Sequence, residues 1–148
     1  LRCAQGRELR PDVVLVDPIY LMDYEANTSK TSGGDVANTS KKIRRIAGYT
    51  NTVIHVVTQA EEVKDDKDDD GNRELRAPRR GEYKKTSSIL EDSTYAFGID
   101  SLDGRGLIEQ LKGRSGGEGL QVEVLYLPNF GIVREFEVGE SAVSDFDF

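Results

Sequence analysis

Two short apolar segments lie in the first part of the chain. The stretches "DVVLVD" (12–17) and "TVIHVVT" (52–58) are rich in valine and isoleucine and have polar residues on either side. A short run of β-branched residues with few polar interruptions predicts a strand buried on both faces, as in a parallel sheet. We therefore expect two buried strands here.

The residues between these strands change to a helical period. From 35 to 47 the apolar positions fall on one stripe: Val36, Ile43, Ile46 and Ala47. The basic residues lie mostly on the other side: Lys41, Lys42, Arg44 and Arg45. Asp35 can cap the start of this helix, the cations suit its carboxyl-terminal end, and Gly48 can stop it. A strand, a helix and a strand in this order predict a right-handed parallel crossover.

The second half of the chain has the pattern of a sheet built from hairpins. Residues 87–100 predict a short helix followed by a strand. Three further strands are predicted in order along the chain: 106–113, 120–127 and 131–138. The turns "RSGGEG" and "PNFG" join them, which favours antiparallel hairpins. The predicted fold class is α/β, with a mixed sheet that is antiparallel at its carboxyl-terminal end, followed by an acidic flexible tail over 139–148.

A long polar region, roughly 61–86, separates the two halves. Its first part is acidic: Glu61, Glu62, Asp65, Asp66, Asp68, Asp69 and Asp70. Its second part is basic: Arg73, Arg76, Arg79, Arg80, Lys84 and Lys85. A loop of this length in a compact domain is usually functional or disordered. The stretch 66–77 has aspartates at calcium-loop spacing, but Ala77 stands where the bidentate glutamate is needed, so a solvated loop is the better interpretation.

Composition narrows the class of protein. The 148 residues suffice for one domain, and the net charge of −7 argues against general nucleic-acid binding while leaving room for a local basic patch. The single cysteine, Cys3, excludes an internal disulfide framework and fits a reducing compartment. No apolar run approaches the roughly 20 residues of a membrane span. We expect a cytoplasmic protein and, because the chain begins at Leu1 without an initiator methionine, part of a longer polypeptide.

Polar residues follow both predicted parallel strands. Asp17 ends the first strand and Gln59 follows the second. The carboxyl ends of parallel strands form the crevice where α/β sheets bind ligands, and an aspartate there can hold Mg²⁺ through its water shell. The two residues together point to one site, although Asp17 by itself could be a strand-end turn residue. His55, the only histidine, has no Cys or His partner nearby, so we expect it to be packed in the core.

The stretch "KGRSGGEG" (112–119) combines glycines with two cations. A P-loop has its lysine after the glycines and at the start of a helix, whereas here Lys112 comes first and a strand-like segment follows. Lys112 and Arg114 are two residues apart, so on an extended segment they share a face. Two cations on one face are costly unless an anion is near. A phosphate is therefore one interpretation of the pair, and an exposed basic strand end is the other.

In order and spacing, these segments resemble the carboxyl-terminal half of the RecA-fold motor domain of the DnaB family, the hexameric replicative helicases of bacteria and phages. The resemblance covers roughly 10–137. "VVLVDPIYLMD" resembles the family's Walker B strand, and "DVANTSKKIRRIAGYTNTVIHVVTQ" follows its helix and its glutamine strand. "EYKKTSSILED" resembles the family's D-L-R-x-S-G-S-I-x-x-D stretch, and "KGRSGGEG" fits its K-x-R-x-G-x-x-G motif.

The resemblance implies a partial RecA-like P-loop ATPase core over 1–138, from the Walker B strand onward, with ATP and Mg²⁺ as cofactors. Asp17 would be the residue associated with Mg²⁺, and Gln59 would sense the γ-phosphate. Lys112 and Arg114 would reach across the subunit interface to the ATP of the neighbouring protomer, with Arg114 as an arginine finger.

The resemblance also implies partners. The protein would form a hexameric ring of identical subunits, translocate on single-stranded DNA and unwind duplexes. Segment 61–86 would be its DNA-binding loop, through Arg73, Arg76, Arg79, Arg80, Lys84 and Lys85. The acidic tail ending in "SDFDF" resembles the partner-docking tails of replication proteins, which makes primase or polymerase a further candidate partner.

The chain departs from the family in ways that bear on activity. The family's Walker A loop and catalytic glutamate lie upstream of the Walker B strand, and this sequence contains neither. We therefore expect the 148 residues alone to be inactive in ATP hydrolysis, and a longer chain to supply the missing parts. Two alternatives stay open: a RecA- or KaiC-like recombinase or ring ATPase, and a non-enzymatic RecA-fold protein that binds DNA without a Walker A loop.

Overall fold

The structure, a computed structural model, describes five stretches of the chain: 11–27, 32–60, 73–79, 81–83 and 88–137. These residues separate into two compact units. The first unit is formed by Leu1–Ala60 with Tyr83–Ser93, and the second by Glu61–Glu82 with Thr94–Phe148. Each unit has its own strands, and each is described by itself.

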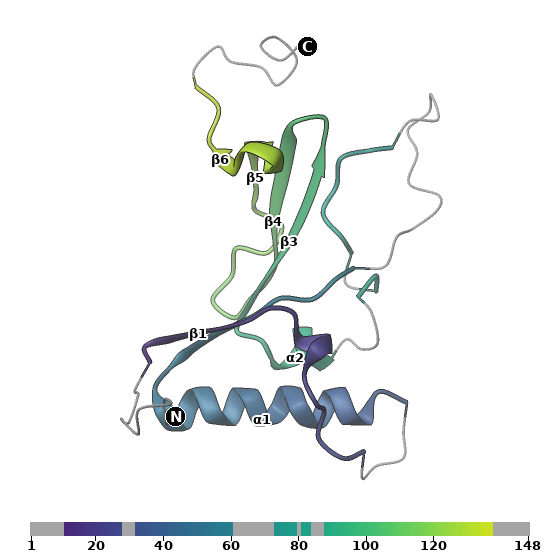
Figure 1. Cartoon of the computed structure of the whole chain (residues 1–148), viewed down its shortest axis with the longest axis vertical. Coiled ribbons are helices and arrows are strands. Elements are labelled where there is room, and N and C mark those ends of the chain that lie inside the picture. The colour runs from purple at the N-terminus through teal and green to yellow at the C-terminus, as the bar shows by residue number, and fades with distance from the viewer. Residues whose placement is uncertain (1–10, 28–31, 61–72, 80, 84–87, 138–148) are drawn as a thin grey trace. The chain divides into compact units, whose positions relative to one another are not determined.

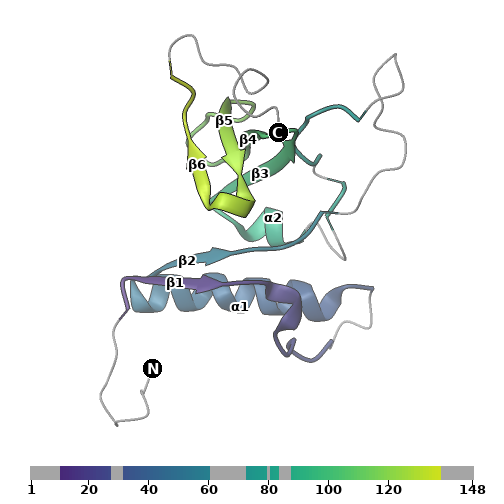
Figure 2. The same ribbon diagram turned by 45° about the horizontal axis from the view of Figure 1, so that its top comes forward.

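The first unit is a strand, helix and strand with a short helix added. Strand β1 (Val13–Val16) runs parallel to β2 (Val53–Val56), with Val13 opposite Val53 and Val16 opposite Val56. Between them lie a single 3₁₀ turn, η1 (Ile19–Leu21), and the long helix α1 (Gly34–Thr50); α2 (Ser88–Asp92) packs on α1. Figure 2 shows β1 and β2 side by side along α1. The predicted strand–helix–strand order and parallel pairing are confirmed.

The expectation that both faces of β1 and β2 are buried is wrong. Exposed and half-buried residues alternate along each strand, and Val13, Leu15 and Val53 are 52%, 74% and 55% exposed. His55, which we expected in the core, lies on the exposed face of β2. The physical reason is that a strand is buried on both faces only when a layer covers each of them, and among the described residues of this unit α1 covers one face.

The helix also differs from its prediction at both ends. It begins after Gly33, whose φ of 73° places it in the left-handed region, and the Asp35 carboxylate accepts a hydrogen bond from the N–H of Val36 instead of capping. It continues through Gly48 to Thr50, and the C-cap residue Asn51, with a φ of 52°, turns the chain out of the helix. The cations therefore lie in the middle of α1, because its last turn contains no basic residue.

The core of the first unit combines apolar side chains with satisfied hydroxyls. Ile19 and Val36 are 1% and 2% exposed. Thr39 is buried as well, and its hydroxyl donates to the Asp35 carbonyl while it accepts the Glu25 N–H at 2.8 Å. These bonds satisfy polar groups that would otherwise be costly to bury, and they hold the segment after η1 against the first turns of α1.

The second unit is a four-stranded antiparallel meander (Figure 1). Its strands are consecutive neighbours: β3 (Tyr95–Leu102), β4 (Arg105–Gly113), β5 (Gln121–Leu127) and β6 (Ile132–Arg134). The predicted antiparallel hairpins are confirmed, and "PNFG" forms the 3₁₀ turn η2 (Pro128–Phe130) with Gly131 after it. Strand β6 is shorter than predicted, because it ends at Arg134.

Part of the long polar region belongs to the core of this unit. The buried apolar residues of the second unit are Ala77, Leu107, Leu111, Val124 and Leu125. The absence of a side chain at Gly98 of β3 lets Ala77 of the preceding segment pack closely against this strand. A Cβ added at Gly98 would lie 3.1 Å from Ala77 and 3.0 Å from Leu111 of β4. Residues 75–78 are therefore half-buried or buried, which differs from the solvated loop that we expected, whereas Arg73, Glu74 and Arg79 are exposed. The acidic half of the region and the tail 139–148 lie outside the described residues.

No helix in the described part of the chain is long and apolar enough to cross a membrane.

Candidate functional site

Asp17 and Gln59 lie beyond the carboxyl ends of two neighbouring parallel strands. The pairing continues past the strands themselves, because Val57 donates to the Val16 carbonyl at 2.9 Å and Ile19 donates to the Val57 carbonyl at 3.0 Å. Asp17 follows β1 directly, its peptide bond to Pro18 is cis, and its side chain is exposed, as is that of Gln59. The structure thus places both predicted residues at one edge of the β1–β2 pair.

This edge offers one carboxylate and one amide to a ligand. The described residues contain no group of three His, Cys, Asp or Glu side chains that could hold a metal ion. A Mg²⁺ ion bound at Asp17 would therefore take its remaining ligands from water and from phosphates, which is the usual way that Mg²⁺ is held in nucleotide sites. The exposed carboxylate fits that role.

Lys112 and Arg114 lie where β4 ends. Lys112 is half-buried and pairs with Ala96 of β3, and the Arg114 N–H donates to the Thr94 carbonyl at 3.2 Å. The Arg114 side chain is exposed, and its guanidinium has no hydrogen bond or ion pair with the described residues. A backbone anchor with an open guanidinium is suited to contact an anion supplied from elsewhere.

The glycines of "KGRSGGEG" have a local structural reason. The backbone after β4 adopts positive φ at Gly116, Gly117 and Gly119, with values of 97°, 85° and 84°, where residues with a Cβ are strained. A Cβ on Gly113 would lie 2.2 Å from the Gly116 carbonyl oxygen. The glycines therefore form the turn between β4 and β5, and the turn itself requires no phosphate.

Gln110 secures this turn, and sequence reasoning missed it. The side-chain Nε2 of Gln110 donates to the Gly116 carbonyl at 2.8 Å, and the backbone carbonyl of Gln110 accepts a hydrogen bond from the Gly119 N–H at 2.9 Å. The available signal was weak, because a glutamine near the end of an alternating strand is usually just an outward-facing polar residue. Gln110 stabilises the turn that follows Lys112 and Arg114.

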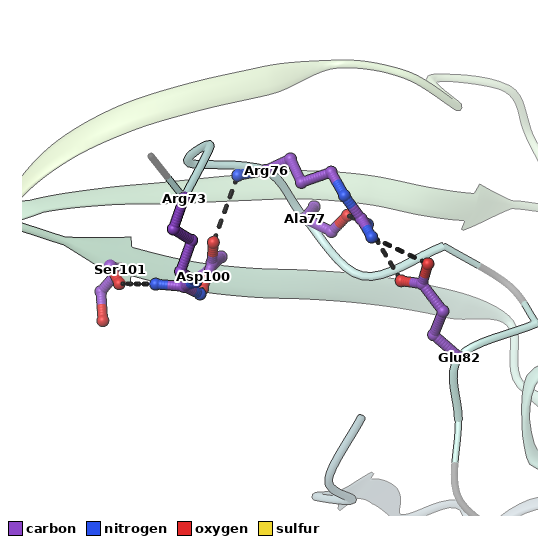
Figure 3. A network of polar contacts seen from close by, with 6 residues as sticks. All are labelled: Arg73, Arg76, Ala77, Glu82, Asp100 and Ser101. Atoms are coloured by element: carbon purple, nitrogen blue, oxygen red, sulfur yellow. Dashed lines mark hydrogen bonds and ion pairs between the residues drawn. The ribbon is translucent and has the colours of Figure 1, made fainter. Parts of the chain in front are cut away.

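The predicted DNA-contacting arginines are partly engaged within the second unit. Figure 3 shows that Arg76 makes a two-pronged contact with Glu82, from Nη1 to Oε2 at 2.9 Å and from Nη2 to Oε1 at 2.8 Å. Arg73 pairs with the carboxylate of Asp100 and donates from Nη1 to the Ser101 carbonyl at 2.9 Å. Asp100 also accepts the Arg76 N–H at 3.2 Å, so it ties this segment to β3.

The Arg76–Glu82 pair is electrostatically strong. Hydrogen bonding to Arg76 and to the Arg79 N–H, opposed by partial burial, holds the pKa of Glu82 at about 2 instead of 4.5. The same hydrogen bond raises the pKa of Arg76 above its ordinary value. Both side chains are 16% exposed, which leaves the pair partly shielded from solvent.

Among the remaining predicted DNA-contacting residues, the structure describes Arg79. Arg79 is exposed, and its side chain makes no ion pair with the described residues. Arg80, Lys84 and Lys85 lie outside the described residues. Among the described cations of this segment, Arg79 is thus the one whose side chain is open to an external anion.

The fold that carries these residues is RecA-like: an α/β chain with a parallel strand pair and antiparallel hairpins at its carboxyl-terminal end. Among solved structures, the chain is similar to the ATPase domain of a DnaB-like helicase, with a TM-score of 0.67 and 12% sequence identity. The match covers 90% of this chain and 48% of that chain, so this chain spans about half the length of its neighbour. The sequence matches no protein-family model and no curated protein.

Proposed function

We propose that this chain is the carboxyl-terminal part of the ATPase domain of a ring-forming DNA helicase. The observation that carries the proposal is the fold shared with the ATPase domain of the DnaB-like helicase over 90% of the chain. The positions of Asp17 and Gln59 at one edge of the parallel strands support it, because α/β sheets bind ligands outside the carboxyl ends of their strands.

In this proposal each bound ATP is contacted by residues of two neighbouring subunits. Bound Mg²⁺ would offset the negative charge of the phosphates. Asp17 would hold that ion through its water shell, and Gln59, from the neighbouring strand, would contact the γ-phosphate. Lys112 and Arg114 would act on the nucleotide of the adjacent subunit, where an arginine adds about 10³- to 10⁵-fold to the rate of phosphoryl transfer.

Movement on DNA would depend on the polar region 61–86. Its open cations would contact backbone phosphates of single-stranded DNA, which makes binding independent of sequence and sensitive to salt. Arg79 is the strongest described candidate for such a contact, because Arg73 and Arg76 are held by Asp100 and Glu82. In this view the two held arginines position the segment and do not themselves bind DNA.

The first test concerns the coding DNA. We expect the region upstream of the Leu1 codon to encode G-x-x-x-x-G-K-[ST] between a strand and a helix, in the same reading frame. A start codon at that boundary would contradict the helicase proposal. It would favour a DNA-binding protein that does not hydrolyse ATP.

The second test asks whether Arg114 acts across a subunit interface. In the full-length polypeptide, Arg114→Ala should lower ATP turnover by about 10³-fold or more while ATP binding stays intact. Asp17→Asn should impair the subunit's own ATP site. A mixture of the two variants should regain turnover, because an Arg114→Ala subunit with an intact Asp17 then meets a neighbour with an intact Arg114.

The control is Arg105→Ala, which removes a cation from β4, the strand that Arg114 follows. Arg105 pairs with Glu123 at the surface, and both side chains are about half exposed. We expect this variant to turn over ATP normally. Normal turnover by Arg114→Ala, or a mixture no more active than its components, would contradict the proposed role in trans.

A further inference from the structure

Helix α1 carries an open groove that the proposed ATP site does not use. The groove has a volume of about 670 Å³, and it is lined by Lys41, Arg44, Arg45, Gly48, Tyr49 and Asp92. The first five residues are spaced by three and four along α1, which places them on one stripe of the helix. Asp92 comes from the end of α2, in the same unit. We call this feature the α1 groove.

The α1 groove is positively charged. Lys41, Arg44 and Arg45 are exposed, and none of them forms an ion pair with the described residues. Lys42 on the same helix differs, because it pairs with Glu25 and does not line the groove. The chain as a whole has a net charge of −7, so its overall composition does not account for a cluster of three unpaired cations. They favour an anionic ligand, and guanidinium groups suit phosphate in particular.

An aromatic ring stands beside these cations. Tyr49 is 96% exposed, so its ring contributes little to the core of the unit. It lies one helical turn after Arg45, and the intervening Gly48 has no side chain to fill the space, since a Cβ added there would meet nothing within 4 Å. Cations followed by an open aromatic ring are the elements with which proteins hold single-stranded nucleic acid, where bases stack on the ring.

Asp92 indicates that the ligand is more than phosphate. Its Oδ2 is buried, so that oxygen is out of reach of a ligand in the open groove. Its carboxylate charge at the groove lining would nevertheless repel a ligand made only of phosphate. A nucleic-acid strand carries phosphates for the cations and also flat bases for the ring of Tyr49.

We propose that the α1 groove binds single-stranded nucleic acid. The phosphates lie on Lys41, Arg44 and Arg45, and a base stacks on Tyr49. None of these residues belongs to the region 61–86, and the site requires neither ATP nor ring assembly.

The test measures binding of a fluorescein-labelled oligodeoxycytidine of about 12 nucleotides, within the site sizes of such proteins, to the 148-residue chain without ATP. We expect wild-type affinity to fall steeply with salt. Because a single strand contributes about 0.7 to the logarithmic salt slope for each phosphate contact, Arg44→Gln with Arg45→Gln should reduce the slope by about 1.4. The control Lys42→Gln should leave the slope unchanged.

Substitutions at two further positions test base stacking on Tyr49 and the open space at Gly48 without altering charge. Tyr49→Ala should weaken binding by about 5- to 150-fold, while Tyr49→Phe retains it, since stacking uses the ring and not the hydroxyl. Gly48→Leu should fill the groove and also weaken binding by at least tenfold. Circular dichroism should show that each variant keeps the helix content of the wild type.

Three results would overturn the proposal. One is a salt slope that Arg44→Gln with Arg45→Gln leaves unchanged while Arg79→Gln lowers it, which would place all binding in region 61–86. Another is wild-type affinity in both Tyr49→Ala and Gly48→Leu. The third is tighter binding of an acidic peptide with the sequence "SDFDF" than of the oligonucleotide, weakened by the same variants, which would make the groove a protein-docking site. ATP turnover enters none of these measurements, so the helicase proposal is tested separately.

Discussion

Glu82 and Asp100 determine whether Arg76 and Arg73 are available to bind an external anion. Arginines in a long polar stretch look available for phosphates, but here each of the two meets a carboxylate of its own unit (Figure 3). A guanidinium paired with a carboxylate has its charge largely offset, so it attracts a second anion less strongly than an unpaired one. The charge that matters for an external ligand is therefore the charge left after internal pairing.

The depressed pKa of Glu82 predicts a specific loss of stability in acid. Its folded pKa is about 2 and its ordinary value 4.5, so its contribution is complete above pH 4.5 and is lost as the pH falls toward 2. Glu82→Gln should lower the free energy of unfolding at pH 7 by about 2 kcal/mol, an ordinary magnitude for hydrogen bonds to a charged group. Urea unfolding between pH 7 and pH 2.5 measures the difference, which should shrink toward zero in acid.

The matched control for this prediction is Glu123→Gln. Glu123 pairs with Arg105 at the surface, where an exposed ion pair contributes about 0–1 kcal/mol. Its effect should be small at every pH. A difference between wild type and Glu82→Gln that stays constant from pH 7 to pH 2.5 would mean that the Glu82 carboxylate is not stabilised in the folded state.

At the scale of helices and turns, glycine has opposite effects on stability in the β4–β5 turn and in α1. In the turn, Gly113 approaches the backbone of Gly116 so closely that any side chain would collide with it. In α1, Gly48 lies inside the helix with free space around its Cα. The first glycine is required by a close approach of backbone, whereas the second weakens its helix and leaves the α1 groove open.

The same substitution should therefore have opposite signs at these two positions. Gly113→Ala should destabilise the protein by about 1–3 kcal/mol, because overpacking against backbone forces the turn to move. Gly48→Ala should stabilise it by about 0.5–1 kcal/mol, because alanine has the higher helix propensity and its Cβ meets nothing. Thermal unfolding of both variants measures the signs. Equal effects at the two positions would contradict this account of the turn.

At the scale of the molecule, each of the two units leaves one apolar strand face exposed in the part of the chain that the structure describes. In the first unit these residues are Val13, Leu15 and Val53; in the second they are Tyr95, Phe97 and Ile99, each of the latter 50–58% exposed. The residues between them are half-buried or, at Gly98, buried. Scattered exposed apolar residues are ordinary, but alternate residues along a strand form a continuous surface.

This exposure predicts strong binding of the dye anilinonaphthalene sulfonate by the folded 148-residue chain. Leu15→Lys and Phe97→Lys should each lower dye fluorescence, because each removes an exposed apolar side chain. Neither should change the free energy of unfolding by more than about 0.5 kcal/mol, as is usual for surface substitutions. Fluorescence titration with dye and urea unfolding provide the two measurements. Unchanged fluorescence in both variants would mean that these faces are covered.

Local sequence patterns were enough to predict the elements and much of their connectivity. Hydrophobic periodicity and turn residues depend on neighbours close along the chain, so they located β1, α1, β2 and the hairpins of the second unit within a few residues. They also placed Asp17 and Gln59 at one edge, because parallel strands align their carboxyl ends. The resemblance to RecA-fold helicases depends on the order of these segments, and the similarity to the DnaB-like ATPase domain supports its fold.

Which side chains are covered, paired or open could be learned from the folded molecule alone. Whether Leu15 and His55 are buried depends on whether a second layer covers their strands, and that layer is not encoded in the strand's own pattern. The partner of Arg76 is a carboxylate brought next to it by the turn of the chain between them, and Asp100 is reached from a strand 24 residues away. The open cations of the α1 groove became visible in the same way. The burial of a side chain and the charge it has left for a ligand depend on contacts between residues distant in the sequence. A local sequence pattern does not determine those contacts.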